Sequence, residues 1–103
     1  MISLENLVDK KIFLVLRDIE SFSDTGLDSE KLVATLKGYE KRRGIWIELE
    51  SVSQTALTVK GKDLADCKAF VFIPWSHIAT IVHYPDKEGL EVKDYKAKKI
   101  GFR

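Results

Sequence analysis

The sequence predicts a small, mostly β domain in which a short N-terminal helix precedes about five strands. Runs of β-branched and aromatic residues recur along the chain, and turn-forming residues separate them. Residues 45–50, IWIELE, alternate apolar and polar side chains, as a strand with one buried face does. The length of 103 residues suits one domain with one core.

The N-terminal helix is expected over residues 3–9, because Ser3 suits an N-cap and the apolar residues after it share one helical face. The first strand is expected at 11–17, since this run is apolar and too short for a second helix. The remaining strands are expected at 31–39, at 45–50 with a continuation or bend through 51–59, and twice within 67–84.

The connections between these strands are polar. Residues 20–30 read as a loop from which Phe22 and Leu27 reach back to the body of the domain. Residues 40–44, EKRRG, form a charged turn that ends in glycine, and residues 60–66 form another turn. Ile45, Ile47 and Leu49 are then expected to face the core, with Trp46 on the polar face.

The charge distribution divides the chain into two parts. The formal net charge is +1, so no global field recruits nucleic acid or membranes. Residues 93–103 carry a local charge of +4, which leaves −3 on residues 1–92. We expect one domain over 1–92 and a basic tail over 93–103, which either binds an anionic polymer or frays as a terminus.

The cellular setting follows from what the composition excludes. A single cysteine, Cys67, cannot form an internal disulfide, which favours a reducing compartment. No apolar run approaches the roughly 18 residues of a membrane span, and no signal peptide is evident. The predicted location is therefore the cytoplasm, without a membrane partner.

One stretch, LVATLKGYEKRRGIWIELES, resembles the first motif of the Sm and Sm-like (Lsm) proteins. A strand that ends in Leu-x-Gly, then an aromatic and an acidic residue, matches Leu36, Gly38, Tyr39 and Glu40. The stretch FVFIPWSHI lies where that family has its second motif, a strand with a tight corner into the last strand. The resemblance covers roughly residues 3–84. It implies a strongly bent five-stranded antiparallel barrel, capped by a helix and assembled into a homo-oligomeric ring through its last two strands.

The departures from the family pattern concern the residues that contact RNA. In that family an asparagine before the third strand contacts the RNA base, and the matching residue here is Gly44. The family's arginine-glycine pair at the last corner is replaced by Pro74 and Trp75. The acidic residue that is usually an aspartate in the family is Glu40 in this chain. Since Pro74 lacks a backbone donor, it fits a corner, a bulge or an edge. The fold can thus be shared without the family's RNA specificity.

The candidate nucleic-acid-binding residues are Lys41, Arg42, Arg43 and Trp46. The three cations suit phosphates, and an exposed tryptophan beside them suits stacking on a base. The alternative for the cations is a solvated hairpin turn. The alternative for Trp46 is packing in a subunit interface, and Trp75 is expected in an interface or in the core.

No catalytic, metal or cofactor site is predicted. His77 and His83 are six residues apart in one strand, about 20 Å, so they cannot share a metal ion. Cys67 has no cysteine or histidine at zinc-ligand spacing. The resemblance therefore implies a non-enzymatic, Sm-like homo-oligomer, with RNA bound with weak sequence selectivity as the ligand expected by analogy with that family. The alternative is a protein-interaction or assembly module on the same fold without nucleic acid.

Overall fold

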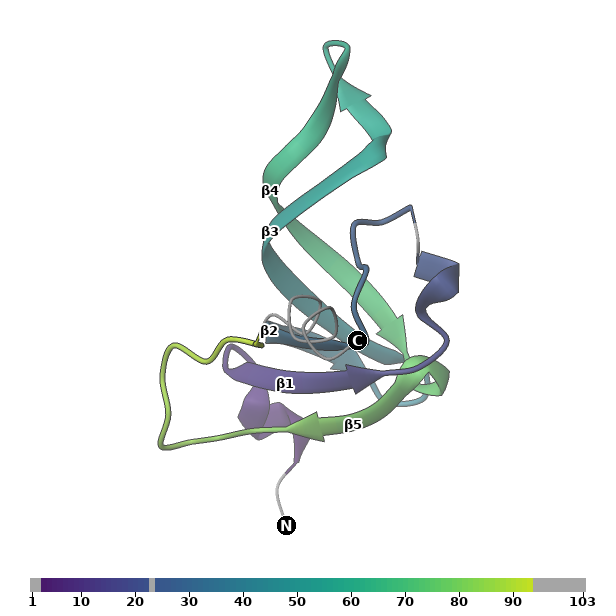
Figure 1. Cartoon of the computed structure of the whole chain (residues 1–103). Coiled ribbons are helices and arrows are strands. Elements are labelled where there is room, and N and C mark those ends of the chain that lie inside the picture. The colour runs from purple at the N-terminus through teal and green to yellow at the C-terminus, as the bar shows by residue number, and fades with distance from the viewer. Residues whose placement is uncertain (1–2, 23, 94–103) are drawn as a thin grey trace, which may run out of the picture.

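The computed structural model describes residues 3–22 and 24–93, which form one five-stranded antiparallel sheet with short 3-10 helices (Figure 1). The strands lie in the order β4-β3-β2-β1-β5 across the sheet. The mostly β class and the antiparallel five-stranded sheet are thus confirmed. In chain order the elements are η1 (Leu4–Leu7), β1 (Lys11–Leu16), η2 (Ile19–Phe22), β2 (Lys31–Glu40), β3 (Gly44–Val59), β4 (Lys62–Pro74), η3 (Trp75–His77) and β5 (Ile78–Val82).

The prediction of an N-terminal helix over 3–9 is wrong, because this segment holds only the 3-10 turn η1. The Ser3 side chain makes no capping hydrogen bond, and Val8 is already extended. Asp9 then takes a left-handed conformation with φ 69°, which ends the turn. Its backbone N–H donates to the Leu36 carbonyl at 2.6 Å, so the chain leaves η1 directly against β2. A helix this short does not recover the cost of helix nucleation.

Closure of the sheet into a barrel is not observed in the single chain. β1 pairs with β2 on one side and with β5 on the other, whereas β4 pairs with β3. β4 and β5 therefore lie at opposite ends of the strand order as edge strands. The sheet is nevertheless bent, since β3 and β4 run steeply across β1 and β5 (Figure 1). Register shifts at Val15/Leu16 and at Leu36/Gly38 contribute to this bend, because bulges bend strands.

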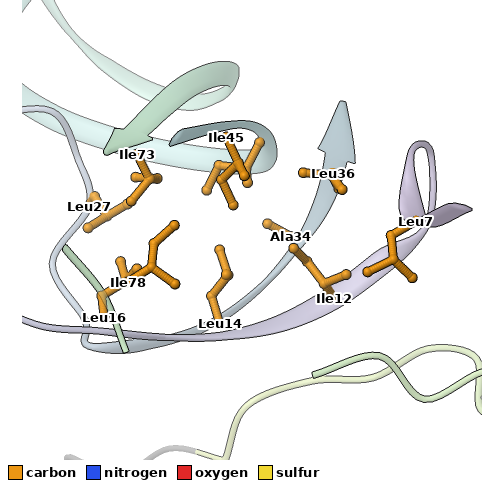
Figure 2. Close-up of a cluster of buried hydrophobic side chains, with 11 residues drawn as sticks. Leu7, Ile12, Leu14, Leu16, Leu27, Ala34, Leu36, Ile45, Ile73 and Ile78 are labelled. Atoms are coloured by element: carbon orange, nitrogen blue, oxygen red, sulfur yellow. The ribbon is translucent and has the colours of Figure 1, made fainter. Parts of the chain in front are cut away.

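The core lies on the concave side of this bent sheet (Figure 2). Burial of each large side chain contributes roughly 1.5–3 kcal/mol. Loop residue Leu27 is buried and Phe22 packs against the core, which confirms that this loop folds back. Leu49 also packs there, as the alternation of β3 predicted. The largest fully buried side chains are Ile12, Leu14, Leu36, Ile45, Ile47 and Ile73.

The hairpin between β3 and β4 is longer than predicted, because the turn expected over 60–66 occupies only Lys60 and Gly61. Both residues have positive φ, 53° and 81°, the signature of a two-residue type I′ turn. Val59 and Lys62 pair directly across it, so residues 62–66 belong to β4. β3 and β4 consequently extend beyond the sheet as a two-stranded ribbon (Figure 1).

Two further expectations concern the ends of the chain and the membrane. The basic tail over 93–103 lies outside the described residues, apart from Lys93. Within the described ranges, the 3-10 helices have at most four residues each, and none can cross a membrane.

Candidate nucleic-acid interface

The basic turn, residues 41–43, joins β2 to β3. The Arg43 backbone N–H donates to the Glu40 carbonyl at 2.9 Å, which closes the turn. Glu40 and Gly44 pair directly at its base. The Lys41, Arg42 and Arg43 side chains therefore leave the end of a well-formed hairpin, and all three residues are exposed.

Trp75 holds this turn from the neighbouring corner between β4 and β5. Its indole Nε1–H donates to the Lys41 carbonyl at 2.9 Å, and its backbone N–H donates to the Arg43 carbonyl at 2.9 Å. The ring is half-buried and packs against the core, one of the two places expected for Trp75. The basic turn thus has two hydrogen bonds to a residue that is itself anchored, and its backbone position is fixed.

The first residue of β3, Gly44, has no side chain that could reach a ligand, and the structure leaves no space for one. It pairs with Pro74 of β4, and the two backbones approach closely. A Cβ atom at this position would lie 2.1 Å from the Ile73 carbonyl oxygen and 2.8 Å from the Pro74 Cα. Gly44 is fully enclosed by this contact, so the polar reader that the Sm-like pattern places here has no space in this chain.

The charges of the basic turn are weakly neutralised. The Arg43 guanidinium lies 4.0 Å from the Glu40 carboxylate, and the two side chains are 78% and 47% exposed. Such an exposed pair is worth less than about 1 kcal/mol and is screened by salt. Among the described residues, no carboxylate lies within 4.0 Å of the Lys41 or Arg42 side-chain nitrogens. The turn therefore offers three cations to an anionic ligand.

Trp46 lies on the outer face of the β3–β4 pair and belongs to an aromatic patch, defined by Trp46, Phe70 and Phe72. Trp46 pairs with Phe72 across the ladder, with ring centroids 5.3 Å apart and an interplanar angle of 56°. Phe70 follows on the same face, opposite Glu48. Trp46 is 41% exposed and Phe70 57% exposed. Trp46 is close to the basic turn along the chain. In the structure, however, it packs against phenylalanines of the edge strand β4.

Carboxylates accompany the aromatic patch. The Glu48 side chain is only 15% exposed, and its carboxylate lies 3.8 Å from the Lys68 ammonium. Glu50, two residues further along β3, is exposed. The Lys68 ammonium offsets the charge of Glu48, so the patch carries little net charge and offers phosphate fewer cations than the basic turn does.

The two histidines are tied to the backbone of β1 and its end. The His77 Nδ1 lies 3.1 Å from the Arg17 carbonyl oxygen, and the His83 Nδ1 lies 3.2 Å from the Lys11 carbonyl oxygen. A carbonyl only accepts, so each Nδ1 carries the proton. His77 also packs edge-on against Phe22, with centroids 4.8 Å apart. Among the described residues, no group of three histidine, cysteine or acidic side chains could hold a metal ion.

One ionisable group has a shifted pKa. The Asp9 carboxylate accepts a hydrogen bond from the Lys37 ammonium at 2.7 Å. This hydrogen bond and the attraction of the same carboxylate raise the pKa of Lys37 above its ordinary value of 10.5. The pair ties η1 to β2 and lies outside the candidate interface.

The anchoring role of Trp75 was not predicted from the sequence, whereas Phe70 was expected among apolar residues too numerous for one core face. The role of Trp75 depends on a corner that brings residue 75 to residue 41, which spacing along the chain does not reveal. The exposure of Phe70 has a signal in the alternation of residues 69–73, which places it on the face opposite the core. Comparison with models of known families, with curated proteins and with solved structures finds no match to this chain.

Proposed function

We propose that the chain is a non-enzymatic, Sm-like module that self-associates and binds the phosphate backbone of single-stranded RNA with little sequence selectivity. The five antiparallel strands and the tight corner at Pro74–Trp75 support the architecture. The edges of β4 and β5 support self-association, because unpaired edges are templates for strand pairing between chains. In an assembly of this kind, β4 of one copy pairs with β5 of the next and closes a ring.

The single observation that carries RNA binding is the anchored basic turn. Its three consecutive cations are exposed, and its backbone is held by Trp75. Because the site is preformed, binding orders only side chains, and a ring would repeat the cluster in every subunit. Phosphate contacts carry no sequence information, and Gly44 offers no polar side chain to a base.

The test is binding of labelled uridine-rich and mixed single-stranded RNA by fluorescence anisotropy at low salt. Replacing Lys41, Arg42 and Arg43 together by alanine should weaken both RNAs by a similar factor of ten or more. The matched control removes three exposed cations elsewhere, Lys10, Lys11 and Lys87. Absence of RNA binding at low salt would contradict the proposal. So would binding that survives the triple substitution and disappears on removal of residues 93–103.

A second candidate function is an assembly module without nucleic acid. It is favoured by the aromatic patch, whose exposed Trp46 and Phe70 side chains are of the kind enriched in protein interfaces. Light scattering separates the possibilities when it is combined with the RNA measurement. An oligomer that binds no RNA supports the second candidate, whereas a monomer at high micromolar concentration contradicts self-association in both.

A further inference from the structure

One hydrogen bond at the corner shows which way each backbone group of β4 points. The Trp75 N–H donates to the Arg43 carbonyl at 2.9 Å, so residue 75 directs its N–H towards the β3 side. Residues 69–74 of β4 pair with residues 44–49 of β3 without a register shift. Successive residues of a regular antiparallel ladder direct their N–H and C=O groups to opposite sides. The odd-numbered residues of 69–74 therefore bond to β3, and the even-numbered ones point away from it.

The even-numbered residues, Phe70, Phe72 and Pro74, define the open edge of β4. β4 is the last strand in the order of the sheet, and no strand of the described chain lies on its other side. Phe70 and Phe72 each present an N–H and a C=O group to this edge. Pro74 presents a carbonyl but has no N–H to donate. The open edge thus has two donors and then, at the corner, a residue that cannot donate.

Pro74 suits this position and no neighbouring one. Its ring replaces an N–H that points away from β3, so no hydrogen bond of the β3–β4 ladder is lost. The ring instead projects to the open edge, where prolines in native sheets hinder the addition of another strand. Pro74 pairs with Gly44, which in turn pairs with Glu40 at the base of the basic turn. The blocked position therefore lies at the level of the basic turn.

We infer that Pro74 is an edge stop, which limits strand pairing between copies to the part of β4 that ends at Phe72. A strand opposite Pro74 would meet the proline ring and keep a carbonyl without a donor, which is unfavourable. The strand that pairs here in the proposed assembly, β5 of a second copy, has 5 residues, whereas β4 has 13. The edge before Pro74 is thus long enough to pair with all of β5.

This inference rests on the self-association in the proposed function and adds what determines its register. Phe70 and Phe72 supply the backbone donors, and Pro74 excludes registers that extend to the corner. The added strand then ends before Trp75, the residue that anchors the basic turn. The cations of the turn consequently stay accessible to phosphate in the assembled protein.

The first experiment is hydrogen exchange of the wild-type chain below and above its association concentration, read by NMR after quenching and dissociation. The amides of Phe70 and Phe72 should slow by about ten-fold or more on association, because they gain partners only there. The amides of Ala69 and Val71 are bonded to β3 in the single chain and should already be slow. Phe70 and Phe72 amides that exchange equally fast in both states would overturn the inference.

The second experiment compares Phe70→Pro with Phe70→Ala by light scattering over a concentration series. Both variants remove the phenyl ring, but only proline removes the N–H at the open edge. Phe70→Pro should associate about ten-fold more weakly than Phe70→Ala, and both should stay folded by circular dichroism. Equal association of the two variants would overturn the inference. So would unfolding of Phe70→Pro alone, since it would show that residue 70 donates to β3.

The third experiment restores a donor at the stop. Pro74→Ala adds one N–H to the open edge, and association should tighten by about three-fold or more. Pro85→Ala is the matched control, because Pro85 is exposed and lies outside the strands. It should associate like the wild type. A Pro74→Ala chain that also associates like the wild type would show that this proline only shapes the corner, and would overturn the edge stop.

The two proposals fail separately. A wild-type chain that is monomeric at high micromolar concentration defeats both self-association and the edge stop. An oligomeric wild type without added protection at Phe70 and Phe72 defeats the edge stop alone. Absence of RNA binding in an oligomer that shows this protection defeats the phosphate site and leaves the edge stop intact.

Discussion

Gly44 and Pro74 are direct partners across the β3–β4 ladder, and the glycine lets the two backbones meet at the corner of the sheet. The sequence departs from the Sm-like pattern at both positions. The structure shows that these departures belong to one contact, because a side chain at residue 44 would collide with the backbone of Ile73 and Pro74. A glycine at residue 44 and the close approach of Pro74 are thus coupled.

Replacing Gly44 by asparagine should destabilise the fold rather than create a base reader. The new Cβ would lie 2.1 Å from the Ile73 carbonyl oxygen, so the strands must separate, at a cost of about 1–3 kcal/mol or more. Gly38→Ala is the matched control, since its Cβ meets nothing within 4 Å. Urea denaturation measures both. Similar stabilities for the two variants would contradict the close contact.

Trp75→Phe should loosen the basic turn without disturbing the core. The substitution keeps an aromatic ring but removes the indole donor to the Lys41 carbonyl, which costs about 1 kcal/mol. We expect a small loss in the free energy of unfolding and faster backbone motion at residues 41–43 in NMR relaxation. Trp46→Phe serves as the control and should leave the motion of the turn unchanged.

The pKa of Lys37 should fall towards its ordinary value when Asp9 is replaced by asparagine. Asparagine accepts the left-handed conformation of residue 9 but removes the charge that raises the pKa. Titration of the lysine Cε signals by NMR measures the shift, and Asp63→Asn is the control. An unchanged Lys37 pKa in Asp9→Asn would contradict the pairing.

The same pair has a defined pH dependence. Because the folded pKa of Lys37 is raised, its contribution to stability is complete below the unfolded value of 10.5. It is lost as the pH rises through the folded value. Both side chains are substantially exposed, so the effect is small and weakens in salt. Denaturation midpoints from pH 9 to pH 12 should converge for wild type and Asp9→Asn.

The slope of the salt dependence of RNA binding should report how many phosphates the basic turn contacts. Three contacts predict a slope of about −2 for the logarithm of the binding constant against that of the salt concentration, at about −0.7 per phosphate on a single strand. Removing Lys41, Arg42 and Arg43 should bring the slope of this site close to zero. A steep slope that survives in this variant would place the electrostatic contacts elsewhere.

Local patterns were enough to predict the sheet and much of its core. The alternation in residues 45–50 assigned Ile45 and Ile47 to the buried face, where both have no exposure. The helix over 3–9 failed because three apolar residues on one face do not establish a helix when Asp9 adopts a left-handed conformation. The spacing of the apolar residues Leu4, Leu7 and Val8 suits an α-helix, but it equally suits a 3-10 turn that packs on the sheet.

Contacts between distant segments explain what the sequence could not reveal about the site. The exposed cations at 41–43 follow from a hairpin turn, which local reasoning handles well. The hydrogen bonds from Trp75 to this turn depend on where the β4–β5 corner lies in space. The length of the β3–β4 hairpin was missed because Lys60 and Gly61 form a compact type I′ turn, and the charged residues after it resembled a loop.

The pairing of β1 with β5 has a consequence for the synthesis of the chain on the ribosome. Leu14 pairs with Ile81, so the first strand waits for almost the entire sequence before its second neighbour exists. The β2–β3 and β3–β4 hairpins need only nearby segments and can form while translation continues. During this interval β1, with apolar side chains on both faces, is an open edge in the nascent protein. Slow translation of residues 60–82 should therefore promote aggregation, and a chaperone that covers β1 should suppress it.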